Sequence, residues 1–240
     1  MKRIFLILLV LSVPMFSGCE QQVPKEDYFP LQDGLSWQYR VTENLLDEEH
    51  RRSFSIENLG PVSLKGDYED LPVSIRRTSD DTDYYIVQDD TGSHRIATRT
   101  VVEFKPRFDS EERTILPPKS SWNSGVVWHV ESAPYVLHTT RNQSMPDPKK
   151  RRFVLTYEVL DTDSEVIVPA GIFKNSLKIR GRGVVSFYAD PMKGYQDVNV
   201  VQTEWYAPGV GLVKLVREEP MDLKFFKGGS ITFELERFER

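Results

Sequence analysis

The sequence predicts a mainly antiparallel β fold, built as a curved sheet, a sandwich or a half-barrel, with little helix. Three observations support this class. Val, Ile, Thr, Phe, Tyr and Trp make up 76 of the 240 residues and only five residues are Ala, a balance that favours strands over helices. Apolar and polar residues alternate with period two along several segments. Clusters of Gly, Pro and Asp separate those segments, as turns separate strands.

The chain begins with features of a signal peptide, predicted over residues 1–18. Two basic residues precede an apolar run from 4 to 16, which is shorter than the roughly 20 residues that a membrane-spanning helix needs. Two small residues then lead to Cys19, the only cysteine of the chain. The pattern predicts an exported protein. An ordinary signal peptide followed by an incidental cysteine is the alternative.

The residues around Cys19 resemble the lipobox of bacterial lipoproteins. In that family the cysteine thiol receives a diacylglycerol, and cleavage leaves the cysteine as the first residue. Phe16 stands where most members have Leu, three residues before the cysteine. The resemblance implies that Cys19 is lipidated and anchors the chain in a membrane. Glu20, where an Asp commonly signals inner-membrane retention, favours the outer membrane on its periplasmic side, and residues 19–27 would form a short polar tether.

Strands are predicted throughout the β-rich domain, residues 28–240. Alternation and turn signals place them at 37–41, 54–56, 73–77, 84–87, 96–104, 153–159, 184–188, 198–206 and 212–216. A hairpin is expected to join 221–225 to 231–235 through Lys227-Gly228-Gly229, because paired glycines suit a tight turn. The one expected helix is a turn or two over residues 43–50.

A faint internal duplication into residues 28–110 and 116–240 is a further hypothesis, with a seam near 111–123. A Gly-x-x-Trp motif ends at Trp37 in the first unit and at Trp128 in the second, and a strand is predicted after each. Chance similarity among β-rich segments is the alternative.

Three motifs carry a second resemblance: FPLxxGxxWxY over 29–39, VPAGxF over 168–173 and WYAPGVGLV over 205–213. They are similar to motifs of a poorly characterised group of bacterial envelope lipoproteins. That group has no agreed activity, so the resemblance implies fold and location but no chemistry. We expect the motif glycines to form turns, and Trp37, Trp128 and Trp205 to stabilise the core rather than contact a ligand.

No catalytic, cofactor-binding or metal site is predicted. The mature chain would have no free thiol, which excludes disulfides, zinc thiolates and cysteine nucleophiles, and it has no Gly-x-Ser-x-Gly elbow. Asp80 and Asp81 are expected to be solvated at the tip of a turn, with a calcium site formed by Asp80, Asp81 and Asp83 as the weaker alternative. No metal-binding spacing links the four histidines, His50, His94, His129 and His138.

Two functions remain open, both without catalysis. Loss of residues 1–18 leaves 29 Lys and Arg against 36 Asp and Glu, which argues against nucleic acid as a partner. The first function is a binding or assembly module for an envelope partner. The alternative is a carrier of lipid or another amphiphile in a β cavity, analogous in fold only to the outer-membrane lipoprotein-insertion proteins. The basic run 149–152 predicts a solvated loop, or alternatively a contact with anionic headgroups.

Overall fold

The computed structural model describes residues 24–45, 48–64, 71–139, 150–190, 192–224 and 226–240. Cys19 and the predicted signal peptide lie outside this range. Most of the described chain is strand, which confirms the predicted fold class. No helix among the described residues is long and apolar enough to cross a membrane.

The described residues form one sheet of thirteen strands, and every neighbouring pair in it is antiparallel. A short 3₁₀ helix, η1 (Lys119–Ser124), links two of the strands. The strands are β1 (Ser36–Leu45), β2 (Glu48–Val62), β3 (Val73–Thr78), β4 (Asp83–Asp89), β5 (Gly92–Arg99), β6 (Arg107–Leu116), β7 (Val127–Ser132), β8 (His138–Thr139), β9 (Phe153–Val168), β10 (Gly171–Asp190), β11 (Gly194–Ala207), β12 (Gly211–Asp222) and β13 (Phe226–Glu239).

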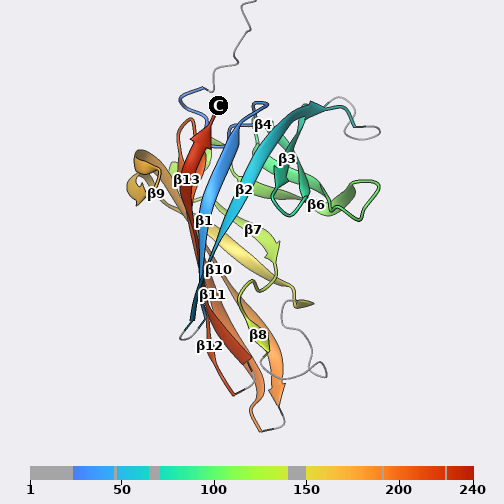
Figure 1. Ribbon diagram of the computed structural model, residues 1–240, viewed down its shortest axis with the longest axis vertical. Coiled ribbons are helices and arrows are strands. Elements are labelled where there is room, and N and C mark those ends of the chain that lie inside the picture. The colour runs from blue at the N-terminus through green and yellow to red at the C-terminus, as the bar shows by residue number, and fades with distance from the viewer. Residues whose placement is uncertain (1–23, 46–47, 65–70, 140–149, 191, 225) are drawn as a thin grey trace, which may run out of the picture.

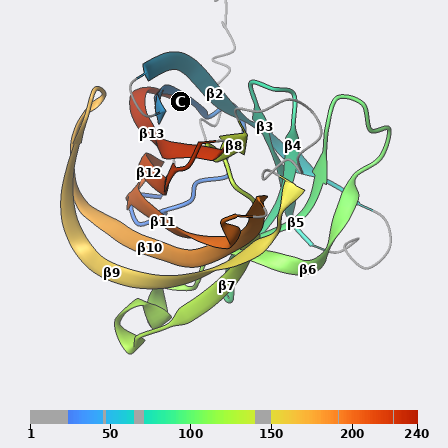
Figure 2. The ribbon, with the colours of Figure 1, turned by 90° about the horizontal axis from the view of Figure 1, so that it is seen from below.

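The sheet consists of two meanders that meet where β1 pairs with β13. Its order is β6-β5-β4-β3-β2-β1-β13-β12-β11-β10-β9-β7, and β8 pairs with β13 off this path. The sheet is strongly curved, so that β9 to β12 face β3 to β6 across an interior that contains β8 (Figure 2). Curvature also brings the two ends of the order together, since Cα atoms of β6 and β7 approach within 8 Å.

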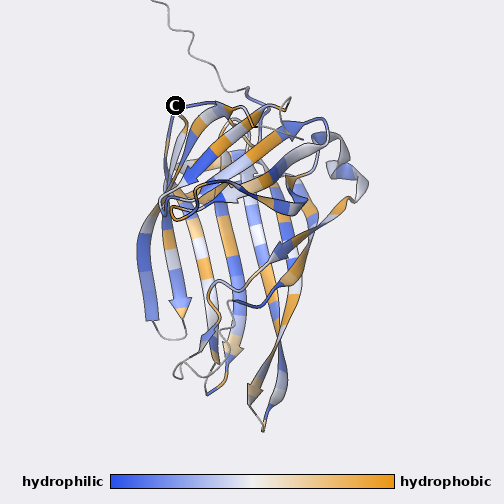
Figure 3. Ribbon diagram, turned by 90° about the vertical axis from the view of Figure 1, so that its right-hand side faces the viewer, coloured by the Kyte–Doolittle hydropathy of each residue, from blue (hydrophilic) through white to orange (hydrophobic). Residues whose placement is uncertain are grey.

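Side chains alternate between the concave and convex faces, as the sequence pattern predicts. β7, for example, buries every second residue, and alternating apolar and polar bands mark the long strands in Figure 3. The largest buried cluster fills the concave side and includes Trp128, Phe153, Tyr157, Leu137 and Phe226. The segment that carries β8 therefore contributes to the core and covers part of the concave face.

Two of the resemblance motifs contact each other at the end of the molecule where the described chain begins. The indole Nε1 of Trp37 donates a hydrogen bond to the carbonyl of Val210 at 2.7 Å, and the Tyr39 hydroxyl donates to the carbonyl of Leu212 at 2.7 Å. Gly209, at φ 72°, makes the turn that presents these carbonyls. Trp37 is buried, as predicted for a core residue, whereas Trp205 is half-buried.

The helix predicted over residues 43–50 is wrong, because residues 43–45 lie in β1 and residues 48–50 lie in β2. Glu43 lies opposite His50 in the ladder and accepts a hydrogen bond from Arg52. Pairing across the hairpin therefore outweighs the weak local preference for helix.

The predicted turn at Gly228-Gly229 is also wrong. Both glycines lie within β13, and the connection from β12 runs from Asp222 to Phe226. A Cβ atom on Gly228 would lie 1.9 Å from the carbonyl oxygen of Glu219, and one on Gly229 would lie 1.9 Å from that of Asn44. The glycines are needed because the neighbouring backbones approach closely, not because the chain reverses there.

Candidate functional site

A cleft of about 800 Å³ lies between β6 and β7, the two ends of the sheet order. We call it the seam cleft. Consecutive residues line it on both sides, 107–113 from β6 and 129–132 from β7. On β6, the register of the ladder with β5 shifts between Phe108 and Arg113, so the bulged residues 109–112 line the cleft in succession. The remaining lining comes from Thr82, Tyr84, Arg95, Thr98, Thr100, Ala133, Tyr135, Arg152 and Val154.

Both walls of the seam cleft expose backbone that no other strand covers. Within the described part of the chain, β6 pairs with β5 alone and β7 with β9 alone. Their outer edges therefore present backbone N–H and C=O groups to the cleft. Such an edge is a template for pairing with another extended chain.

Charged side chains line the seam cleft, with both signs present. Arg95 holds Asp109 in a two-point ion pair, with N–O distances of 2.7 and 2.9 Å, and this pair joins β5 to β6. Arg152 lies 3.9 Å from Glu131. The cleft is thus suited to a polar ligand rather than to an acyl chain.

A buried polar network lies behind the cleft, on the concave face of β11 and β12. The carboxylate of Glu204 accepts hydrogen bonds from the hydroxyls of Tyr157 at 2.8 Å and Tyr206 at 2.5 Å, and from the amide of Gln202 at 2.6 Å. Gln202 in turn accepts a hydrogen bond from Arg217 at 2.8 Å. Burial, reinforced by the negative charge of Glu204, raises the pKa of both tyrosines well above the ordinary value, so both stay protonated donors.

Arg217 and Glu219 form the inner end of the network, and neither side chain is exposed to solvent. Arg217 donates to Glu219 at 2.6 Å and to the carbonyl of Ala133 at 2.7 Å. Glu219 accepts hydrogen bonds from the backbone N–H groups of Tyr135, Val136 and Leu137, at 2.8–3.0 Å. One buried carboxylate therefore fixes the segment that passes from the cleft into the core.

Asp83, the third aspartate of the calcium alternative, lies at the start of β4. It is buried, and its carboxylate is held by Arg77 at 2.7 Å and by Arg99 at 2.5 Å. Burial alone would raise the pKa of Asp83, but the hydrogen bonds from the two guanidinium groups outweigh it and lower the pKa. Asp80 accepts a hydrogen bond from Thr78 instead, so the three aspartates of the calcium alternative are not gathered.

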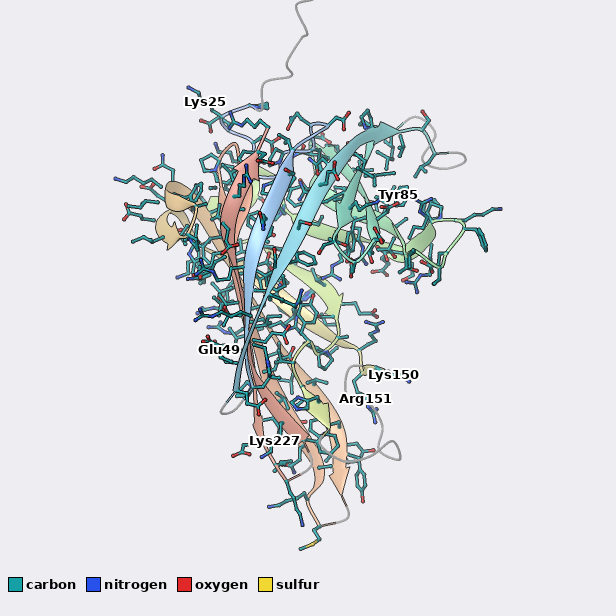
Figure 4. All side chains as sticks on the ribbon, in the orientation of Figure 1. Lys25, Glu49, Tyr85, Lys150, Arg151 and Lys227 are labelled. Atoms are coloured by element: carbon teal, nitrogen blue, oxygen red, sulfur yellow. The ribbon has the colours of Figure 1, made fainter. Side chains whose placement is uncertain are left out.

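The histidines and the basic run that the sequence offers as candidate site residues do not come together in the structure. His50, His94, His129 and His138 lie on four different strands, and among the described residues no three His, Cys, Asp or Glu are grouped to hold a metal ion. Lys150 and Arg151 are exposed and project from the sheet into solvent (Figure 4). Lys149 and Cys19 lie outside the described residues.

The polar network was not predicted, although the sequence contains a signal for it. Gln202 and Glu204 occupy the same alternating register as Val198, Val200 and Tyr206, which points all five toward one face. A polar residue in an apolar register needs a buried partner. The partners come from β9, β12 and residues 132–137, and only the folded chain brings these together.

Comparisons with known proteins give two structural likenesses. No protein-family model matches the chain, and no curated protein matches it. The crystal structure of a putative lipoprotein from Parabacteroides distasonis is similar at 16% identity, with a TM-score of 0.43, over 88% of this chain and 98% of that one. A putative exported protein with a YmcC-like fold from Bacteroides fragilis is similar at 13% identity, with a TM-score of 0.36, over the same shares.

Proposed function

We propose that this chain is a lipid-anchored lipoprotein of the bacterial envelope, held through Cys19 at the periplasmic side of the outer membrane. We further propose that its domain is a non-catalytic binding module that takes an extended segment of a partner protein into the seam cleft. The observation that carries the binding proposal is the pair of uncovered strand edges that face each other across the cleft. An extended segment placed there would add hydrogen bonds to an uncovered edge.

The carboxylates behind the cleft also support a binding role over catalysis. Glu204 and Glu219 accept hydrogen bonds from tyrosine, amide, guanidinium and backbone groups. The bond from Tyr157 joins β9 to β11, and the bonds to Glu219 from residues 135–137 hold that segment on β12. A general acid or base must instead reach a substrate proton. Both carboxylates thus have a structural task that accounts for their burial.

The amphiphile-carrier alternative requires an apolar cavity on the concave face. Core side chains fill that face, and Leu137 and Phe226 beside β8 are almost completely buried. The seam cleft, which remains open, is lined largely by charged and polar groups. The geometry therefore favours the binding module.

The anchor is tested by Cys19→Ser. We expect the variant to leave the membrane fraction or to accumulate as an uncleaved precursor, because serine has no thiol to receive a diacylglycerol. Cell fractionation and the intact mass of the purified protein measure the outcome. An unmodified mature chain that begins at a residue other than Cys19 would contradict the proposal.

The binding site is tested by photo-crosslinking in cells. A photoreactive amino acid at Ser110 on β6, or at Glu131 on β7, should form an adduct with one and the same partner, because both positions line the cleft. The same amino acid at the exposed Lys174 on β10 is the matched control and should not capture that partner.

Two results would count against the proposal. The first is capture of the same proteins from all three positions, which would indicate nonspecific proximity. The second is a lipid that co-purifies in native mass spectrometry and is lost on denaturation, together with no cleft adduct. That combination would favour the carrier.

A further inference from the structure

The loop between β5 and β6 presents three apolar side chains to solvent. Val101 is 74% exposed, Val102 is 80% exposed and Phe104 is 100% exposed. Large apolar residues scattered singly on a surface need no explanation, but three within four residues at the tip of one hairpin form a patch. The hairpin projects sideways from the half of the molecule in which the described chain begins (Figure 1).

Hydrogen bonds within the loop hold this arrangement. The backbone N–H and the hydroxyl of Thr100 donate to the carboxylate of Glu103 at 2.8 and 3.0 Å, and the N–H of Glu103 donates to the carbonyl of Thr100 at 3.0 Å. Arg107 lies 3.6 Å from the same carboxylate. The polar groups of the turn thus bond to one another, and the apolar side chains are left pointing outward.

The charge of the loop differs in sign from that of the chain. Lys105 and Arg107 follow the apolar tip, against the single acid Glu103 within residues 100–107, whereas Arg99 before the tip is paired with Asp83. The whole chain has a formal charge of −5. Apolar side chains bordered by basic ones match the boundary of a membrane, where acyl chains lie beneath anionic headgroups.

We propose that residues 101–104 insert into the surface of an anionic lipid bilayer, with Lys105 and Arg107 on its headgroups. The proposal rests on the lipid anchor proposed above, because the anchor would hold the domain beside a bilayer. Eight residues lie between Cys19 and Tyr28, which limits the tether to about 30 Å when fully extended. An anchored domain that also inserts this loop would have a fixed face toward the membrane, whereas the tether alone would leave it free to rotate.

The test uses residues 19–240 with Cys19→Ser, a chain that contains every described residue and has no lipid of its own. We expect it to sediment with vesicles of phosphatidylethanolamine and phosphatidylglycerol, and much less with vesicles of phosphatidylcholine alone. Combined replacement of Val101, Val102 and Phe104 by Ser should weaken binding about tenfold or more, since three apolar side chains no longer leave water. Lys105→Gln with Arg107→Gln should weaken it and reduce its dependence on salt.

A second measurement locates the contact. With Phe104→Trp, the tryptophan emission should shift to shorter wavelength on adding the anionic vesicles, relative to the same chain without the substitution. Met192→Ser with Tyr195→Ser is the matched control, because these residues are 95% and 72% exposed on the β10–β11 hairpin at the opposite end of the molecule. The control should bind vesicles as the parent chain does.

Three outcomes would overturn the proposal: no binding of the parent chain, equal binding by the triple serine variant, or an equal loss in the control. None of them bears on Cys19, because the vesicle assay uses an unlipidated chain. Conversely, a Cys19→Ser result that disproves the anchor would leave the vesicle measurement valid. The two proposals can therefore fail separately.

Discussion

Glu219→Gln is expected to lower the free energy of unfolding by about 3–5 kcal/mol. The substitution preserves the size of the side chain but removes its charge, so Arg217 is left buried without its counter-ion. The new amide also brings N–H groups toward the N–H groups of Tyr135, Val136 and Leu137, which now donate to the carboxylate. Denaturant unfolding measures the global loss. Hydrogen exchange at these three amides measures the release of the segment.

Glu236→Gln is the matched control for this prediction. Glu236 also pairs with an arginine, Arg40 at 2.8 Å, but the side chains of Arg40 and Glu236 are 40% and 32% exposed to solvent. The loss there should stay below about 1 kcal/mol, because water solvates both partners. Equal losses for the two variants would mean that the buried carboxylate does not hold the segment.

Replacement of both Arg217 and Glu219 by apolar residues should not restore the stability that Glu219→Gln removes. An isolated buried ion pair can often be exchanged for well-packed apolar side chains at little cost. Glu219, however, also accepts the three backbone N–H groups, and no apolar side chain can accept them. Arg217→Met combined with Glu219→Leu is therefore expected to remain destabilised.

Trp37→Ala is expected to lower the free energy of unfolding by about 3–5 kcal/mol, as is typical for a buried tryptophan. Trp37 is 3% exposed, and its ring lies 5.4 Å from that of Phe238 and 4.7 Å from the guanidinium of Arg76. Its loss also leaves the Val210 carbonyl without the indole donor. Burial lowers the pKa of Arg76 to about 10, which shows how strongly this pocket is desolvated.

Trp205→Ala is the comparison for Trp37. Its ring is half-buried, beside the Lys178 ammonium at 5.1 Å, so we expect a loss of about 1–2 kcal/mol. Thermal and denaturant unfolding of both variants measure the difference. Unchanged stability in Trp37→Ala would contradict a structural role, and it would make that residue a candidate for ligand contact.

The β class could be predicted from the sequence because the alternation of apolar and polar residues along a strand depends only on residues that are close in the chain. The segments at 73–77, 84–87 and 198–206 all lie within observed strands for this reason. The predicted strands are too short where the alternation of apolar and polar residues breaks. In β10, for example, the predicted strand begins at residue 184, whereas the observed strand begins at Gly171. There Gly181 lies against the ring of Tyr157, and a small residue replaces the expected apolar one.

The site could not be predicted in the same way, because it depends on pairing between distant strands. β6 went unrecognised: its residues 107–113 are mostly charged or polar and show no clear alternation. Nothing local indicates that β6 and β7 would both be left as sheet ends, or that curvature would bring them together. The seam cleft is a product of strand order, and strand order is a long-range property. The duplication into residues 28–110 and 116–240 remains a prediction.

The pairing of β1 with β13 has a consequence for how the chain reaches this structure. Ser36 pairs with Glu239, so the ladder that joins the two meanders connects residues from nearly opposite ends of the sequence. Closing so long a loop carries a high entropic cost, and folds with such distant contacts form slowly. During synthesis, β1 cannot pair with β13 until β13, the last of the described strands, has been made. Until then one edge of β1 is uncovered and prone to pair with other chains. Folding speed should therefore depend on residues of β13 more than on those of β3 to β5, whose partners are close in sequence.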